Sequence, residues 1–178
     1  ISPCSVVKKN GRYFLYYIGA DGNRTAPHTD GGPRNRTLGV ATSLDGINFT
    51  KFSGNPVLNL PRGTVNPQEE GAFSCGATLD VDGSVVLYWE QNVGTSALGV
   101  SAHVRLATSS DGFTFTDNGK VLDHTNAPWF RCGGDELGVL GAFQHNGVWS
   151  LYLLEESGCW DLGLATGSTR TTFTSSQG

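Results

Sequence analysis

The sequence contains the same series of short phrases three times, and this repetition restricts the fold more than any other feature. A Leu-Tyr phrase begins at Leu15, Leu87 and Leu151, each time four residues after a glycine. The tyrosines of these phrases stand 72 and 64 residues apart (16 to 88 and 88 to 152). An Ala-Thr pair follows in each copy, and a Phe-Thr pair begins seven residues after that threonine. A period of this length indicates one supersecondary unit stacked on copies of itself.

Each copy contains four short runs that are rich in aromatic and β-branched residues and bounded by turn residues, as β-strands are. In the first copy these runs cover 5–7, 13–17, 38–41 and 48–52. Pairs such as Asn10-Gly11 and Asp82-Gly83 suit two-residue hairpins, because both residues of that turn type need positive φ. No long stretch has apolar residues at helical spacing. Four antiparallel strands per unit are typical of a β-propeller blade.

The sequence therefore predicts an all-β chain that forms part of a single β-propeller domain, 1–178. The predicted four-stranded antiparallel blades cover about 1–58, 66–123 and 132–176. Closed propellers have about four to eight blades. We therefore expect the chain to be part of a larger propeller, packed against remaining blades of the same protein. The alternative is a processed three-blade subunit.

Composition excludes several classes of function. A net charge of −4 provides no basic surface for nucleic acid. No run approaches the roughly 20 apolar residues that a membrane-spanning helix needs, so no membrane insertion is expected. No metal-ligand spacing and no phosphate-binding GxxxxGK[ST] loop is present, so no metal or cofactor is expected.

Two features favour an extracellular location or the secretory pathway. Acceptor triplets for N-glycosylation begin at Asn23, Asn35 and Asn48, the last on the predicted outermost strand. An ordinary polar loop is the alternative interpretation of the first two.

The second feature is an even number of cysteines, which permits three disulfide pairings. Their spacing fits no zinc motif. In the blade arrangement all four lie at one rim, and the favoured pairs are Cys4 with Cys75 and Cys132 with Cys159. The alternative is four free, buried thiols.

The segment 38–58 resembles the blade signature of the five-bladed propeller glycosidases, the arabinanase/xylosidase and invertase/levansucrase superfamily. Leu38 to Phe49 matches the pattern Gly-hydrophobic-Ala-Thr-Ser-x-Asp-Gly-x-x-Trp, and 54–58 matches Asn-Pro-Val-Leu. The segment 105–115 matches nearly as well, and 2–17 is similar to the first-strand pattern of the superfamily. The resemblance implies a five-bladed propeller and a carbohydrate ligand.

The resemblance also implies a pair of carboxyl groups in a central funnel, one protonating the leaving oxygen and one activating water or attacking the sugar. The superfamily has an acid nine residues before the turn glycine of a first strand. Ser2, Ser74 and Gly138 stand at those positions here, and none is acidic. Whether the chain is an enzyme is therefore open, although a glycoside hydrolase-like activity is favoured.

The nearest acids lie slightly upstream of the second and third first-strands. Glu136, on a glycine-rich approach with Trp129 nearby, is the first choice for a general acid, beside Asp135. Glu69 and Glu70 occupy the equivalent approach in the second copy. A shifted register or a bulge would aim one of these acids into the funnel. A solvated loop acid is the alternative for each.

Other residues are candidates for binding a sugar. Trp129 and Trp160 fall in loops at the site end, where an aromatic face suits the C–H face of a sugar. Glu90 and Glu155 follow the Leu-Tyr phrases and are expected to surface at the same rim, as sugar ligands or as loop caps. His103 is expected just before a third strand, near the funnel.

Other repeated residues are assigned structural roles. Asp45 and Asp111 are predicted to make turns, because an Asp side chain binds its own backbone. Trp89 and Trp149 are predicted to pack between blades.

The sequence thus favours an extracellular, carbohydrate-active propeller that resembles a glycoside hydrolase and acts on or binds glycans. The alternative from another class is a non-catalytic module for adhesion, glycan binding or extracellular assembly, and the missing acids support it. A sialidase-like interpretation of the Ser-x-Asp-Gly turns is disfavoured because their spacing is one residue too short.

Overall fold

The computed structural model describes residues 2–20, 36–58, 71–96, 99–123, 125–127, 137–155 and 161–177. Every regular element in this part of the chain is a β-strand. The first four are β1 (Ser2–Lys9), β2 (Arg12–Ala20), β3 (Arg36–Ser43) and β4 (Thr50–Lys51). The next four are β5 (Gly71–Leu79), β6 (Val85–Ser96), β7 (Gly99–Ser109) and β8 (Thr116–Leu122). The last four are β9 (Leu137–His145), β10 (Val148–Glu155), β11 (Leu162–Thr169) and β12 (Thr172–Gln177).

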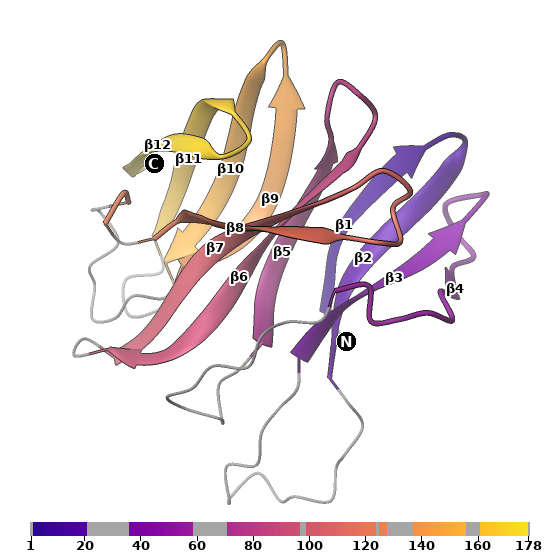
Figure 1. Cartoon of the computed structure of the whole chain (residues 1–178), viewed down its shortest axis with the longest axis horizontal. Helices are drawn as coiled ribbons and strands as arrows, with labels where there is room; N and C mark the ends of the chain where they lie inside the picture. Colours follow the sequence, from indigo (N-terminus) through magenta and orange to yellow (C-terminus); the bar gives the residue numbers. More distant parts are fainter. Residues whose placement is uncertain are drawn as a thin grey trace, which may run out of the picture.

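These strands form three antiparallel meanders of four strands each, in which consecutive strands pair. Figure 1 shows them fanned in chain order, from the indigo first sheet to the yellow last strand. One parallel pairing, Arg36 with Gly71, joins β3 to β5 and links the first two sheets at one corner. The prediction of an all-β fold with three four-stranded antiparallel blades is confirmed.

The first strand of each blade lies nearest the common axis. Contacts between blades run from β1 to β5 and from β5 to β9, and β1 also reaches β9. Three sheets arranged radially with their first strands together have the layout of a β-propeller. The beginnings of β1, β5 and β9 therefore lie at one end of the molecule, and the β1–β2 and β5–β6 turns lie at the other.

Two hydrophobic layers hold the blades together, and β6 contributes to both. Val85, Leu87 and Trp89 face the first blade, whereas Val86 and Tyr88 face the third. This alternation follows from the two-residue period of a strand. Because both faces of β6 are covered, its residues from 85 to 91 are all buried.

In the hydrophobic layer between the second and third blades, the third blade contributes Trp149, Leu151 and Leu153 of β10. Trp89 and Trp149 are both buried between blades, as predicted.

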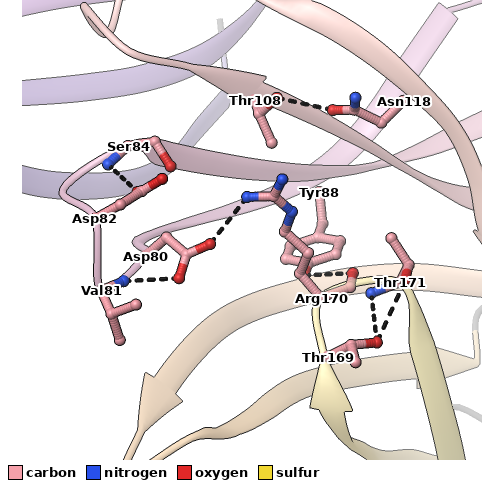
Figure 2. Close-up of polar contacts among 10 residues, drawn as sticks. All are labelled: Asp80, Val81, Asp82, Ser84, Tyr88, Thr108, Asn118, Thr169, Arg170 and Thr171. Atoms are coloured by element: carbon pink, nitrogen blue, oxygen red, sulfur yellow. Dashed lines mark hydrogen bonds and ion pairs between the residues drawn. The ribbon is translucent and has the colours of Figure 1, made fainter.

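The tyrosine of the Leu-Tyr phrase links each blade to the next. The Tyr16 hydroxyl donates to the Gly112 carbonyl oxygen at 3.0 Å, and the Tyr88 hydroxyl donates to the Arg170 carbonyl oxygen at 2.9 Å. Both acceptors lie between the third and fourth strands of the next blade. Burial raises the pKa of both phenols. Figure 2 shows the second link, beside which the Arg170 guanidinium pairs with Asp80 at 2.9 Å.

Tyr152 occupies the same place in the third copy, but it lies on the sheet face directed away from the second blade and is 53% exposed. Leu140, Phe143 and Leu162 are exposed with it. The residues of β10 that alternate with Tyr152 are buried against the second blade. The third blade thus has one covered apolar face and one open apolar face.

The predicted two-residue hairpin turns are confirmed at the β1–β2 and β9–β10 connections. Asn10 has φ 50° and Asn146 has φ 51°, and the glycine that follows each also has positive φ. The β5–β6 turn differs from the prediction, because Gly83 but not Asp82 has positive φ and the Gly83 N–H donates to the Asp80 carbonyl oxygen at 2.9 Å.

The predicted outermost run 48–52 is wrong in extent, because β4 contains two residues. The N–H groups of Ile47 and Asn48 bind Asp45 Oδ1 instead of a strand.

Further along, the Asn55 side chain takes over the pairing that a longer fourth strand would make. The Val40 N–H donates to Asn55 Oδ1 at 2.8 Å, and Asn55 Nδ2 donates to the Val40 carbonyl oxygen at 2.9 Å.

Candidate functional site

The end of the molecule at which β1, β5 and β9 begin is the candidate site. Many residues predicted for this site, for the second disulfide or for glycosylation lie outside the described residues. These are Glu69, Glu70, Asp135, Glu136, Trp129, Trp160, Cys132, Cys159, Asn23 and Asn35. Their proposed roles stay predictions. The described residues show how the beginnings of the inner strands are arranged at this end.

All three inner strands have a register irregularity near their beginning. It lies between Pro3 and Ser5 in β1, and between Ala72 and Cys75 in β5. In β9 the extra residue is Leu140, because Gly141 and Val139 pair with consecutive residues of β10. A β-bulge bends a strand and redirects its side chains, and bulges are common beside active sites. A bulge was one of the two irregularities expected here, and the inner strand of each blade contains one.

A chain of two hydrogen bonds links the beginnings of β5 and β9. The Val139 N–H donates to Ser74 Oγ at 2.6 Å, and Ser74 Oγ donates to Glu90 Oε2 at 2.7 Å. Because the hydroxyl accepts from Val139, its own proton is directed to Glu90. Glu90 is only 2% exposed, and a buried carboxylate requires such donors to offset its lost hydration. The link therefore binds the second blade to the third next to the axis.

Glu155 lies in the same layer between the second and third blades. It ends β10 and is 1% exposed, on the face that also carries Leu151 and Leu153. Glu90 shares its face of β6 with Tyr88, which belongs to that layer too. The expectation that Glu90 and Glu155 surface at the rim is wrong. β6 continues beyond Glu90 to Ser96, and both side chains are covered by the packing of the two blades.

The three positions aligned with the superfamily acids are now located. Ser2 begins β1 and is exposed, Gly138 is buried in β9, and Ser74 holds Glu90. Sequence reasoning treated Ser74 only as a missing acid. The signal that could have identified its role is a polar residue near the beginning of β5, on a strand whose partner β6 carries Glu90 directly after the apolar run 85–89.

His103 lies within β7 rather than just before it, opposite Gln91 in the β6–β7 ladder. Burial, and after it the nearby cations of Arg105 and Lys120, lower the pKa of His103 to about 4. The imidazole is therefore uncharged near neutral pH. Its Nε2 is buried without a hydrogen-bond partner among the described residues. β7 is the third strand of its blade, two strands away from the inner strand β5.

A disulfide joins Cys4 of β1 to Cys75 of β5, with their Cα atoms 5.1 Å apart. This confirms the predicted pairing of these two cysteines. The bond connects the inner strands of the first two blades at the bulges near their beginnings. The inner strands are thus tied together in series, by the disulfide and then by the Ser74 link.

Asn48 lies at the opposite end of the blade and in a turn, not on the outermost strand as predicted. Its side-chain amide donates to Asp45 Oδ2 at 2.8 Å. Ser43 Oγ donates to Asp45 Oδ1, and the same arrangement recurs with Ser109 and Asp111. The prediction that Asp45 and Asp111 make turns is confirmed.

The described residues contain no group of three or more His, Cys, Asp or Glu side chains that could hold a metal ion. Within the same part of the chain, no helix is long and apolar enough to cross a membrane.

Comparisons with known proteins identify the fold. No protein-family model matches the sequence, and no curated protein matches it. A solved glycosyl hydrolase from Bacteroides ovatus is 20% identical, with a TM-score of 0.65 over 98% of this chain and 48% of its own. The family GH32 β-fructofuranosidase of Bombyx mori, in complex with sucrose, is 20% identical, with a TM-score of 0.67 over 98% of this chain and 34% of its own.

An α-L-arabinofuranosidase from Clostridium thermocellum has a TM-score of 0.59 and 16% identity over 99% of this chain and 50% of its own. The chain thus spans half the length or less of these structures. It has the fold of the five-bladed β-propeller glycosidases, and three of its blades are present.

Proposed function

We propose that this chain is part of an extracellular, carbohydrate-active propeller of the glycoside hydrolase type. Its glycan meets the end at which β1, β5 and β9 begin. The proteins with the same fold include an enzyme solved with sucrose, an α-L-arabinofuranosidase and a protein of the GH130 family of mannoside phosphorylases, which contains glycoside hydrolases that target β-1,2 mannosidic linkages. Because the chain spans only part of those proteins, the activity of the whole protein belongs to the proposal.

The observation that carries the proposal is the Val139–Ser74–Glu90 link. It fixes the beginnings of β5 and β9 next to each other. Glu70 directly precedes the first residue of β5, and Glu136 directly precedes the first residue of β9. Glycoside hydrolysis requires two carboxyl groups about 5–10 Å apart, on opposite sides of the scissile bond. The link supports such a pair by joining the two strands from which it would project.

In this mechanism Glu136, or Asp135 beside it, protonates the leaving oxygen. Glu70 activates a water molecule or attacks the sugar ring. Ser74 and Glu90 act as positioning residues, since Ser74 Oγ bridges the Val139 N–H and the buried Glu90 carboxylate. Trp129 and Trp160 provide aromatic faces for the sugar. Glu155 belongs to the layer that supports β9 and β10.

The second candidate function is a glycan-binding propeller without catalysis. It is favoured by one observation, that Ser2, Ser74 and Gly138 replace the acids of the superfamily pattern. A scaffold that keeps its funnel but lacks the aligned acids can bind a sugar without cleaving it.

Hydrolysis assays on the purified protein distinguish the two functions. Sucrose, α-L-arabinofuranosides and β-1,2-mannosides are incubated with the wild type and with the E70Q, E136Q and D135N variants. D82N, a carboxylate in the exposed β5–β6 turn, is the control. We expect turnover of one substrate, reduced about 100-fold or more by E70Q or E136Q and unchanged by D82N. Saturable binding without turnover supports the second function. Neither turnover nor binding refutes both.

Two further parts of the proposal concern location and assembly. The Cys4–Cys75 disulfide supports an oxidising, extracellular or secretory environment, in which Asn23, Asn35 and Asn48 are candidates for glycans. The open apolar face around Tyr152 supports packing against a further blade of the same protein. That blade would offer a turn carbonyl to Tyr152, as Gly112 and Arg170 do for the earlier tyrosines.

A further inference from the structure

A cavity lies at the end of the propeller opposite to the candidate glycan site, between the first and second blades. It has a volume of about 320 Å³. The polar residues that line it are Lys9, Asn10, Arg12, Ser110 and Asp111, and the rings of Phe14 and Phe113 complete it. The first blade contributes its β1–β2 hairpin, and the second contributes the segment between β7 and β8. None of these residues belongs to the candidate glycan site.

The hairpin side of the cavity is positively charged. Lys9 and Arg12 stand directly opposite each other in the β1–β2 ladder, and like charges in such pairs repel. Lys9 Nζ donates to the Gly83 carbonyl oxygen, which holds it over the second blade. The ion pairs of the described residues join other cations, those of Arg105, Lys120 and Arg170. Arg12 forms no ion pair within the part of the chain that the structure describes, so an anionic ligand would relieve the repulsion here.

The opposite wall combines an acid with an aromatic ring. Asp111 Oδ1 accepts hydrogen bonds from Ser109 Oγ and from the N–H groups of Phe113 and Thr114. These bonds hold the pKa of Asp111 at about 2, so the carboxylate is ionised at neutral pH. An ionised carboxylate is an acceptor for hydroxyl donors, and the adjacent Ser110 hydroxyl can donate or accept.

The Phe113 ring is held in place by Phe52 at 4.6 Å and by Phe14 at 5.2 Å between ring centroids. Gly112 allows the close packing beneath it, because a Cβ at that position would lie 2.7 Å from the Phe14 ring. Phe113 thus forms part of the cavity wall through its packing with two rings of the first blade.

We propose that this cavity binds a uronic acid unit of an acidic glycan, with the sugar carboxylate at Arg12 and Lys9, its hydroxyls at Asp111 and Ser110, and its C–H face on Phe113. A carboxylated sugar matches all three elements at once. A neutral sugar has no charge to pair with the two cations, and a simple anion does not use the aromatic ring or the acid.

Titration of the protein with D-glucuronate, followed by NMR chemical shifts, tests this proposal. D-glucose and acetate are the ligand controls. The R12Q variant removes one charge of the site, and K8Q is the matched control, since Lys8 lies over the Tyr13 ring on the other face of the hairpin. Thermal melts establish that both variants fold.

We expect saturable shifts at the amides of 110–113 with glucuronate, and binding at least tenfold weaker in R12Q but unchanged in K8Q. Glucose and acetate are each expected to bind at least tenfold more weakly than glucuronate. The proposal is overturned if glucuronate causes no saturable shifts at these amides, if R12Q and K8Q behave alike, or if acetate or glucose binds as well as glucuronate. Because the variants lie in the β1–β2 hairpin, at the end opposite to the beginnings of β5 and β9, these results are independent of the hydrolysis assays.

Discussion

Replacing Tyr88 by phenylalanine tests whether the repeated tyrosine holds neighbouring blades together. The substitution keeps the buried ring and removes only the hydroxyl that donates to the Arg170 carbonyl oxygen at 2.9 Å. A net contribution of about 0.5–1.5 kcal/mol is typical for such a bond, and a carbonyl left partly unsatisfied adds to the loss. Because Arg170 is only half-buried, water reaches part of that site. We expect Y88F to lower the free energy of unfolding by about 1–2 kcal/mol.

For a chain of this length the loss corresponds to a Tm that is lower by about 2–8 °C, measured by circular dichroism or calorimetry. Y152F is the matched control, because the same repeat position is 53% exposed in the third blade. Its effect is expected to stay within about 0.5 kcal/mol. The reasoning is refuted if Y88F is neutral, or if Y152F destabilises the protein as much as Y88F does.

The remaining predictions concern the framework of the candidate site and the buried histidine. S74A removes a donor from buried Glu90, and urea titration is expected to show a loss of about 2–3 kcal/mol, whereas a neutral result would contradict the role of the link. The Cys4–Cys75 disulfide closes a loop with a sequence separation of 71 residues. Its reduction is expected to lower the free energy of unfolding by about 2–4 kcal/mol, and an unchanged Tm with dithiothreitol would argue against a stabilising role of the disulfide. Since His103 has its pKa lowered from 6.5 to about 4, the unfolded chain binds a proton that the folded chain excludes. Stability should therefore fall as pH drops from 6.5 towards 4, and H103Q should weaken this dependence in thermal melts between pH 7 and 4.

The blade repeat was predictable because the same strand and turn residues recur in three copies along the sequence. The Leu-Tyr phrases, the turn pairs such as Asn10-Gly11 and the Ser-x-Asp-Gly turns each report a local preference of the backbone. Such preferences depend on residues close in sequence, so a turn or strand recognised in one copy predicts the same element in the other copies. The pairing of Cys4 with Cys75 followed from the same arrangement, since both lie near the beginning of an inner strand.

The candidate site was harder to predict because it depends on contacts between blades. Ser74 contacts Glu90 because of the bulge in β5, and it contacts Val139 because the third blade packs beside the second. No local sequence pattern encodes either contact. The burial of Glu90 and Glu155 depends in the same way on two sheets packing face to face. The short β4 shows a local competition, in which Asp45 and Asn55 bind backbone groups that a longer strand would otherwise use.

The central claim is that the linked beginnings of β5 and β9 support a two-carboxylate glycan site. A crystal structure of the protein with the saccharide that it hydrolyses or binds best tests this claim most directly. We predict the sugar at the end where the inner strands begin, between the carboxyl groups of Glu70 and Glu136, which should be about 5–10 Å apart. A sugar bound elsewhere, or these two carboxyl groups directed away from it, would contradict the account.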